Sequence, residues 1–364
     1  MRVPFYDIKA QYEELSSELD RVTHEVLSSG SYAPGKHVKA FEEEIAAYHN
    51  CKHGIAVNSG TDALRIMMDA CGIAAGDEVI TTAFTFVAST ETIMQTGATP
   101  VFVDIDPAHY QIDVSKIEAA ITPRTKAILP IHLFGQLCAI REIKVICEKH
   151  GLILLEDAAQ ALGSHHDGTY AGNFGSAGAL SFYVTKNLGA AGDGGMIITN
   201  DDAVAEKCRS MRVHGMGRER YYYDYLGYTS RLDEIQGAIM RIKLTRLDAW
   251  NARRADLAAI YFEVLGGSSV QLPNLLAGNN STNHQFTIQT DRRDDLQAHL
   301  KENEIDAMIY YPVPLHFHTP YAHLAPRGSL PITESVSNRV LSLPIHPHLR
   351  DEQVRFAAET IAAF

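Results

Sequence analysis

Three short stretches of the chain carry residue types that work together in one kind of chemistry. Lys186 follows a strand-like apolar run and precedes the glycine-rich turn 189–195. Asp157 ends another apolar run, and residues 59–61 (Ser-Gly-Thr) open a helical stretch. A lysine amine condenses with an aldehyde, a buried acid keeps a pyridine nitrogen protonated, and a hydroxyl-rich helix start binds phosphate. Together the three stretches predict a site for pyridoxal 5'-phosphate.

Lys186 and Asp157 are the predicted catalytic residues. A lysine near glycines is usually a solvated surface residue, but a position after a buried strand gives the partial desolvation that keeps an amine neutral. We expect Lys186, once released by the cofactor, to carry a proton as general acid and base. The alternative for Asp157 is a helix N-cap. A carboxylate at a buried strand end is costly unless it is paired, and a pyridinium N–H is a suitable partner.

The remaining cofactor contacts are predicted from hydroxyl, amide and aromatic side chains beside these stretches. Helix N-terminal N–H groups and hydroxyls should bind the phosphate at Ser59, Gly60, Thr61 and Ser181, the alternative being a capped helix without ligand. Gln160 is expected to donate to the 3-oxygen of the ring, or else to be an ordinary first-turn helix residue. Phe84 follows a strand end and is expected to stack on the ring, with simple core packing as the alternative.

Composition narrows the class of protein. The 364 residues, 46% hydrophobic, suffice for one large domain and a smaller one. A net charge of −12 argues against binding to nucleic acid or to anionic membranes. The five cysteines are scattered and form no CxxC pair, which indicates reduced thiols in a cytoplasmic protein. The N-terminal residues form no export-type apolar run, and no apolar stretch is long enough for a membrane span.

The elements that must position these residues alternate between strands and helices. Helical spacing occurs at 11–27 and 38–48. Continuous apolar runs then predict strands at 54–57, 78–81, 100–104, 126–132, 152–156, 179–183 and 196–199. Helical stretches between such runs favour a mainly parallel sheet covered on both faces. Ligands collect at the carboxyl ends of strands in such sheets, which is where all three chemical stretches fall.

The pattern changes after residue 201. A helix at 206–212 precedes a loop rich in tyrosine and arginine, 218–228, and a long helix follows at 232–265 with a possible break. A short strand at 285–289 and a helix at 294–303 indicate a smaller α+β unit. The fold class is therefore α/β, with a large domain at residues 1–250 and a small C-terminal domain at residues 251–364.

Other chemistries find little support. The chain has no HExxH, P-loop or GxSxG motif, and no GxGxxG follows the first strand, which disfavours a nicotinamide dehydrogenase. The pairs His316/His318 and His346/His348 have strand-like metal spacing, but no acidic or cysteine companion stands out in the sequence, so no metal is predicted.

The motifs taken together resemble the DegT/DnrJ/EryC1/StrS family of sugar aminotransferases along nearly the whole chain. The carrying motifs are Asn58-Ser-Gly-Thr-Asp-Ala-Leu64, Gly76-Asp-Glu-Val-Ile80, Thr85-Phe-Val-Ala88, Pro100-Val-Phe-Val-Asp-Ile-Asp106, Glu156-Asp-Ala-Ala-Gln-Ala161, Ser181-Phe, Lys186-Asn-Leu-Gly189, Gly192-Asp-Gly-Gly195, Ser230-Arg-Leu-Asp-Glu-Ile-Gln236 and Leu343-Pro-Ile-His346. The resemblance implies a fold type I pyridoxal phosphate enzyme with a seven-stranded sheet.

The resemblance also implies the reaction. Amino transfer from L-glutamate to a keto nucleotide-sugar is expected. The motif Lys186-Asn-Leu-Gly189 favours dTDP-3-keto-6-deoxyhexose as the substrate. UDP-linked sugars and amination at C4 stay open. Some relatives carry histidine where Lys186 stands and act as dehydratases, so lysine points to a transaminase. A regulatory or binding protein that has kept the fold is the alternative outside enzymes.

Further residues are assigned through the resemblance alone. It places Tyr183, Tyr310, Tyr311 and His316 beside the sugar. It also implies a homodimer in which the residue at 229 reaches the cofactor phosphate of the other subunit. Thr229 stands where the family usually has asparagine, Val184 where proline is frequent and Tyr310 where histidine is frequent.

The tyrosine-arginine loop fits such a dimer. Exposed tyrosine and arginine favour interfaces, and we expect Arg218 or Arg220 to meet the substrate diphosphate. The alternative is a solvated loop.

Overall fold

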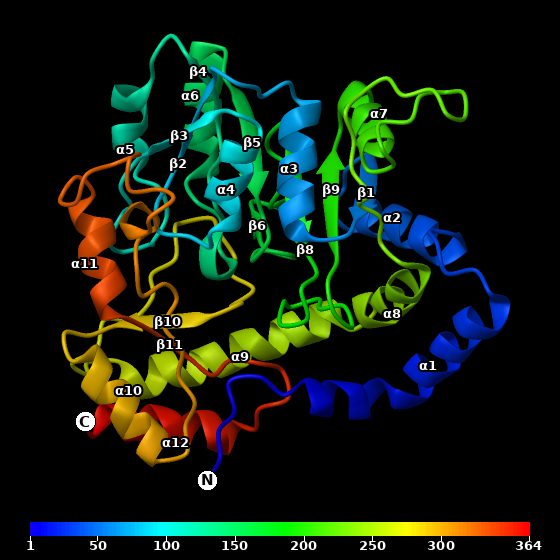
Figure 1. Ribbon diagram of the computed structural model, residues 1–364. Helices are drawn as coiled ribbons and strands as arrows, with labels where there is room; N and C mark the ends of the chain where they lie inside the picture. The colour runs from blue at the N-terminus through cyan, green and yellow to red at the C-terminus, as the bar shows by residue number, and fades with distance from the viewer.

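The computed structural model describes residues 1–364, and its centre is a seven-stranded sheet (Figure 1). The strands are β1 (His53–Val57), β2 (Glu78–Thr81), β3 (Thr99–Phe102), β4 (Thr125–Ile128), β5 (Ile153–Asp157), β8 (Ala177–Ser181) and β9 (Gly195–Thr199). Their order is β1-β9-β8-β5-β4-β2-β3. Only the pairs β1–β9 and β8–β9 are antiparallel. The predicted strands and the mainly parallel sheet are confirmed.

Helices cover both faces of this sheet because successive strand residues point to opposite sides. In β5, Leu154 packs with α2 (Lys36–Tyr48), α6 (Ile140–His150) and α8 (Glu234–Leu244). The next residue, Leu155, packs with α3 (Gly60–Ala70), α4 (Ala88–Gln95) and α7 (Asp202–Met211). Short elements complete this part: α5 (Val114–Ile117), the pair β6 (His165–His166) and β7 (Thr169–Tyr170), and 3-10 turns at Glu118–Ala120 and Leu133–Gly135.

The C-terminal part has a core of its own. The antiparallel pair β10 (Phe286–Gln289) and β11 (Val340–Leu343) packs with α9 (Leu247–Leu265), α10 (Arg293–Glu302) and α12 (Asp351–Ala362). Before β11 lie a 3-10 turn at Leu315–Phe317 and α11 (Pro331–Arg339). Val3 joins this core and bridges to Ile305, so the chain's first residues lie against its last third. A domain boundary at residue 250 stays a prediction; α9 runs across that position without a break.

The N-terminal helix α1 (Ile8–Ser29) extends along the lower edge of the molecule toward α8 (Figure 1). It packs Leu15 and Leu19 against Ile239 and Trp250. The predicted long helix after residue 232 is two helices, α8 and α9, separated at residues 245–246. None of the helices combines the length and the apolarity that crossing a bilayer requires.

The sheet brings the three chemical stretches to one edge. Because β1 and β8 are both antiparallel to β9, they run in the same direction, and β8 is parallel to β5. Their carboxyl ends therefore lie at the same edge of the sheet. Ser59 follows the end of β1, Asp157 ends β5, and Lys186 follows the end of β8.

Candidate active site

A cavity of about 660 Å³ lies at this edge of the sheet. Much of its lining consists of residues that the sequence singled out, namely Ser59, Gly60, Thr61, Asp157, Gln160, Ser181, Tyr183, Lys186, Tyr310 and Tyr311. These residues come from the strand ends and from the C-terminal part of the chain. The fold thus brings Ser59 and Tyr311, which are 252 positions apart, to one cavity.

The start of α3 lies at the cavity, where Ser59, Gly60 and Thr61 belong to the lining. Ser59 caps the helix, and its hydroxyl accepts a hydrogen bond from the backbone N–H of Asp62 at 3.0 Å. A Cβ atom on Gly60 would lie 2.7 Å from the Cβ of Ser181, so only glycine lets the helix start approach the end of β8 this closely. The helix dipole and free N–H groups favour an anion such as phosphate at this point.

Asp157 is a buried carboxylate with two protein partners. It accepts hydrogen bonds from the hydroxyl of Ser89 at 2.7 Å and from the backbone N–H of Ala159 at 3.1 Å. Burial raises the pKa of Asp157, against the lowering effect of the Ser89 hydrogen bond. Residues 158–164 form turns and no helix. The alternatives of an N-cap at Asp157 and a first-turn helix position at Gln160 were therefore wrong.

Lys186 lies in a tight turn after β8. A Cβ atom on Gly189 would come within 2.3 Å of the carbonyl oxygen of Val184, so the turn requires glycine. Burial lowers the pKa of Lys186 to about 8, and the charge of Asp157 opposes this shift. Since the ordinary lysine value is near 10.4, a far larger share of the amine is neutral at physiological pH.

Three tyrosines and Gln160 also line the cavity. The amide of Gln160 accepts from the backbone N–H of Phe134 at 2.9 Å and donates to the hydroxyl of Tyr311 at 3.1 Å. The hydroxyls of Tyr6 and Tyr310 share a hydrogen bond of 3.3 Å. These contacts restrain all three tyrosine side chains in the cavity lining.

The prediction that Phe84 lines the site is corrected by the structure. Phe84 is 1% exposed and packs with Tyr110 and Phe134 in a core cluster. Phe86, two residues on, lines the cavity and is 54% exposed. The run 82–87 contains no regular strand, so no strand periodicity distinguishes the core position from the cavity position.

His316 also lies outside the cavity lining. It is 1% exposed, sits in the 3-10 turn Leu315–Phe317, and pairs with Glu334 of α11 at 3.0 Å. Its imidazole ties that turn to α11, so the predicted contact with the sugar is corrected. The acidic companion that the sequence did not reveal comes from 18 residues further along the chain.

Three other predicted residues are exposed and do not line this chain's cavity. Thr229 accepts a hydrogen bond from Arg231 at 3.0 Å. Arg220 stacks over the ring of Tyr221 at 4.9 Å, and Arg218 is exposed in the same loop. A single copy of the chain therefore does not bring Thr229, Arg218 or Arg220 to the site.

Several cavity residues escaped the sequence analysis. Tyr6 and His284 line the cavity, as do Thr85, Asp193 and Gln285. Tyr6 comes from the N-terminal segment and carries no local signal. His284 directly precedes the predicted strand at 285–289, and its place at a strand end was the one available hint.

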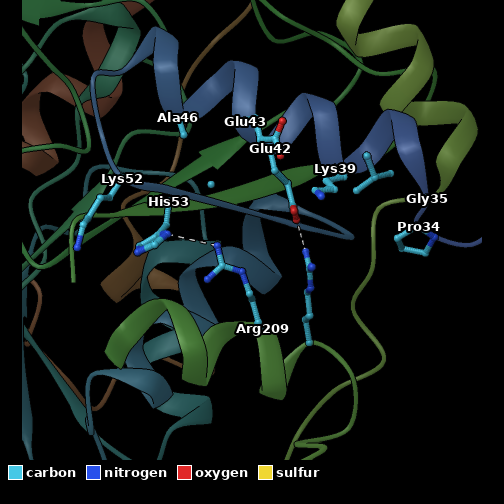
Figure 2. Close-up of a pocket in the computed structure, with 12 residues that line it drawn as sticks. Pro34, Gly35, Lys39, Glu42, Glu43, Ala46, Lys52, His53 and Arg209 are labelled. Carbon is cyan, nitrogen blue, oxygen red and sulfur yellow. Dashed lines mark hydrogen bonds and ion pairs between the residues drawn. The ribbon is translucent and has the colours of Figure 1, made fainter. Parts of the chain in front are cut away.

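A second cavity, of about 430 Å³, lies between α2, β1 and α7, away from Lys186. Figure 2 shows its charged lining. Glu42 pairs with Arg212, and Arg209 contacts the ring of His53 at 3.4 Å. The Glu42–Arg212 pair and the contact of Arg209 with His53 join α7 to α2 and β1, which is typical of a structural surface.

The fold and the cavity define a fold type I pyridoxal phosphate enzyme. Residues 13–362 match the DegT/DnrJ/EryC1/StrS aminotransferase family, and the chain belongs to this family. It is a sugar aminotransferase that depends on pyridoxal 5'-phosphate.

Relatives of known name span the whole chain. A pleiotropic regulatory protein of Geobacillus stearothermophilus is 48% identical, covering 100% of this chain and 99% of its own. The dTDP-3-amino-3,4,6-trideoxy-alpha-D-glucose transaminase of Streptomyces venezuelae is 46% identical, covering 97% and 93%. The UDP-N-acetyl-3-dehydro-alpha-D-glucosamine 3-aminotransferase of Acidithiobacillus ferrooxidans is 43% identical, covering 99% and 97%.

Solved structures are also similar to this chain over its whole length. The crystal structure of S. venezuelae DesV in complex with a ketimine intermediate superposes with a TM-score of 0.97 at 44% identity, covering 100% of this chain and 98% of that one. The structure of NtdA from Bacillus subtilis, with PMP as bound cofactor, superposes with a TM-score of 0.92 at 31% identity, covering 100% and 86%.

The residues present here fit the cofactor. The Lys186 amine has no ion-pair partner within 4.0 Å, Asp157 keeps acceptor capacity toward the cavity, and the start of α3 at Ser59, Gly60 and Thr61 lines the same cavity. A donor set of this kind matches an aldehyde, a ring N–H and a phosphate.

Proposed function

We propose that this enzyme moves the amino group of L-glutamate to the 3-keto group of a dTDP-linked 6-deoxyhexose. The observation that carries the proposal is the placement of Lys186, Asp157 and the Ser59 turn around one cavity in a chain 46% identical to a dTDP-sugar 3-transaminase. A UDP-linked 3-keto sugar is the second candidate, since a UDP-sugar 3-aminotransferase is nearly as similar at 43%.

We infer the following roles for the residues of the cavity. Ser59, Thr61, Ser181 and the N–H groups at Gly60 bind the phosphate, and Asp157 pairs with the ring nitrogen. Gln160 lies beside the ring, and Phe86, rather than Phe84, covers its face. Bound pyridoxal phosphate supplies an electron sink for the carbanion that forms at the substrate carbon. Lys186 holds the cofactor aldehyde and, when released, moves the proton.

The lowered pKa of Lys186 supports this role. A general acid and base works best when its pKa lies near the working pH, because both protonation states are then available. Burial brings the Lys186 pKa to about 8. Asp157 opposes a larger shift, so the amine can still accept a proton from the substrate.

We further propose a homodimer in which loop 218–228 and Thr229 complete the cavity of the other copy. Tyr221, Tyr222 and Tyr223 are each more than half exposed, and Leu226 is 95% exposed. Exposed aromatic and apolar side chains grouped in one loop are typical of an interface. Tyr183 at the cavity, also half exposed, is the side chain we expect such a loop to cover.

We propose that the reaction takes place in the cytoplasm, because all five cysteines are free, as expected in a reducing compartment.

We also propose that Tyr310 and Tyr311, which line the cavity, contact the sugar.

The test compares two buried lysines. Lys186→Ala should abolish turnover of glutamate and keto sugar. Lys243 is a matched control, because burial also lowers its pKa to about 8, but its amine donates to the carbonyl of Gly189 and does not line the cavity. Lys243→Met should lose stability and keep turnover per folded molecule. Normal turnover by Lys186→Ala would refute the proposal.

The substrate is then decided by competition. Equal concentrations of dTDP- and UDP-linked 3-keto sugars are offered, and kcat/KM is measured for each. A preference for the dTDP sugar supports the proposal, and a preference for the UDP sugar replaces it with the second candidate. Cofactor binding without any conversion of glutamate would instead favour a regulatory protein.

A further inference from the structure

His284 lines the same cavity as Lys186 and is not part of the cofactor contacts proposed for Lys186, Asp157 and the Ser59 turn. It is 5% exposed and lines the cavity. Its ring nitrogen Nδ1 lies 3.0 Å from the side-chain oxygen of Asn187, the residue that follows Lys186 in the chain. The turn that carries the lysine is therefore tied directly to this imidazole.

The hydrogen bonds of Asn187 determine the tautomer of His284. The Asn187 amide nitrogen donates to the backbone carbonyl of Thr282 at 2.9 Å and to the side-chain oxygen of Asn251 at 2.8 Å. A carbonyl oxygen only accepts, so the amide nitrogen must face Thr282 and the amide oxygen must face His284. In the neutral ring Nδ1 then carries the hydrogen, and Nε2 carries the lone pair.

The imidazole is also held neutral. Burial, and then the positive charges of Lys186 and Arg254, keep the pKa of His284 well below its ordinary value. Arg254 is itself buried, bonded to the backbone carbonyls of Ile345 and Asn283, and without an acidic partner within 4.0 Å. A second positive charge at His284 is therefore disfavoured.

The Nε2 atom has no hydrogen-bond partner in the protein, and it is not sealed from the cavity. Lys186 Nζ likewise makes no hydrogen bond, so it is free to turn toward this nitrogen. A fixed acceptor near a free amine stabilises the ammonium form and selects the direction in which the amine points.

We propose that His284 is a positioning residue for Lys186: Asn187 fixes it as the Nδ1–H tautomer, and its Nε2 accepts a hydrogen bond from the lysine amine whenever the cofactor has released that amine. This inference rests on the proposed function of Lys186 and adds a residue to it. His284 itself moves no proton; it holds the amine in place between the two halves of the reaction.

The other charged or titratable groups of the cavity are the same in the wild-type protein and in the His284 variants. They are Asp157 from β5, Tyr183 and Asp193 from the region of the lysine turn, Tyr6 from the N-terminal segment, and Tyr310 and Tyr311 from the C-terminal part of the chain. None of these residues is altered in the test below, so a change in the lysine pKa reports on His284.

The test uses the full-length, cofactor-free protein. The rate at which pyridoxal 5'-phosphate binds covalently is followed by absorbance between pH 6 and 10, because only the neutral amine reacts. The wild-type midpoint is expected at about 8. His284→Phe keeps ring bulk and removes the acceptor, so its midpoint should fall by about one pH unit. His284→Gln offers a carbonyl acceptor and should keep the wild-type midpoint.

Two further variants distinguish a specific effect of His284 on Lys186 from a general effect of the substitution on folding. His316→Phe, the same change at a buried histidine outside the cavity, should leave the midpoint unchanged. Should His284→Phe not fold, Asn187→Leu removes the tautomer lock instead and is expected to shift the midpoint in the same direction. In steady state, His284→Phe should lower kcat more than it changes KM for glutamate.

Two results would overturn the inference: an unchanged midpoint in folded His284→Phe, or an equal shift in His284→Gln. Failure of the proposed function looks different, because the wild-type protein itself would then develop no absorbance with the cofactor.

Discussion

Two neighbouring carboxylates at the end of β5 have opposite surroundings. Glu156 is 0% exposed and accepts hydrogen bonds from His132 Nε2 at 2.9 Å and from the backbone N–H groups of Gly172, Phe174 and Gly175 at 2.7–2.8 Å. Asp157 faces the cavity and has only the Ser89 hydroxyl and one backbone N–H. Alternation along the strand sends the two side chains to opposite sides.

The difference in hydrogen bonding indicates a structural role for Glu156 and a functional role for Asp157. A buried carboxylate with four donors is fully satisfied and holds the loop at residues 172–175 onto the sheet. A buried carboxylate with two donors and an open side keeps capacity for a further partner, and burial raises its pKa against the lowering effect of the Ser89 hydrogen bond. Two aromatic side chains differ in the same way: Phe84 is buried in the core, whereas Phe86 lines the cavity.

The largest effect is expected on stability, from a substitution of Glu156, the carboxylate whose hydrogen bonds are all made. Glu156→Gln turns one acceptor into a donor that faces other donors, so the free energy of unfolding should fall by about 3–5 kcal/mol. Urea unfolding measures the loss. Turnover per folded molecule should stay unchanged; a stable protein with impaired turnover would place Glu156 in the chemistry.

Asp157→Asn should show the reverse. The amide cannot hold the ring nitrogen protonated, so kcat should fall by about 10²–10³-fold. Stability should stay within about 1 kcal/mol, because the remaining oxygen can still accept from Ser89. Strong destabilisation of Asp157→Asn together with normal turnover per folded molecule would erase the distinction between the two carboxylates.

The aromatic pair gives a smaller, matched comparison. Phe84→Leu should lower the unfolding free energy by about 1–1.5 kcal/mol with unchanged cofactor affinity. Phe86→Leu should leave stability within about 0.5 kcal/mol. It should weaken cofactor binding by about 2–10-fold, since one aromatic contact is lost. Equilibrium dialysis against pyridoxal phosphate reads the difference, and weaker binding by Phe84→Leu alone would reverse our assignment.

The smallest expected effect is a change in the pH dependence of the rate when the Ser89 hydroxyl, which donates to Asp157, is removed. The Ser89 hydrogen bond favours the charged carboxylate and lowers its pKa, so Ser89→Ala should raise the Asp157 pKa further. The acid limb of the pH–rate profile should then move to higher pH by about one unit. Rates with glutamate across pH 4–8 measure the shift, with Thr85→Ala, a neighbouring hydroxyl that contacts Ser89, as the matched control.

Local chemistry made part of the site predictable. Lys186, Asp157 and the turn at residue 59 stand next to apolar strands, so both their chemistry and their place at the carboxyl edge follow from nearby sequence. Phe84 and His316 were misplaced because nothing local distinguishes a ring in the core from one in the cavity.

The rest of the site required long-range contacts. Tyr6 reaches Tyr310 across 304 positions, and His284 reaches Asn187 across 97. The N-terminal bridge between Val3 and Ile305 that brings Tyr6 to the cavity has no sequence signature. Such positions depend on the packing of the C-terminal part against the sheet, which periodicity does not encode.

The most direct test of the account is the absorbance spectrum of the purified protein before and after addition of L-glutamate. The account predicts a yellow band that glutamate bleaches, since lysine, cofactor and amino donor then act at one site. The absence of a band even after added pyridoxal phosphate, or a band that glutamate leaves intact, would contradict it.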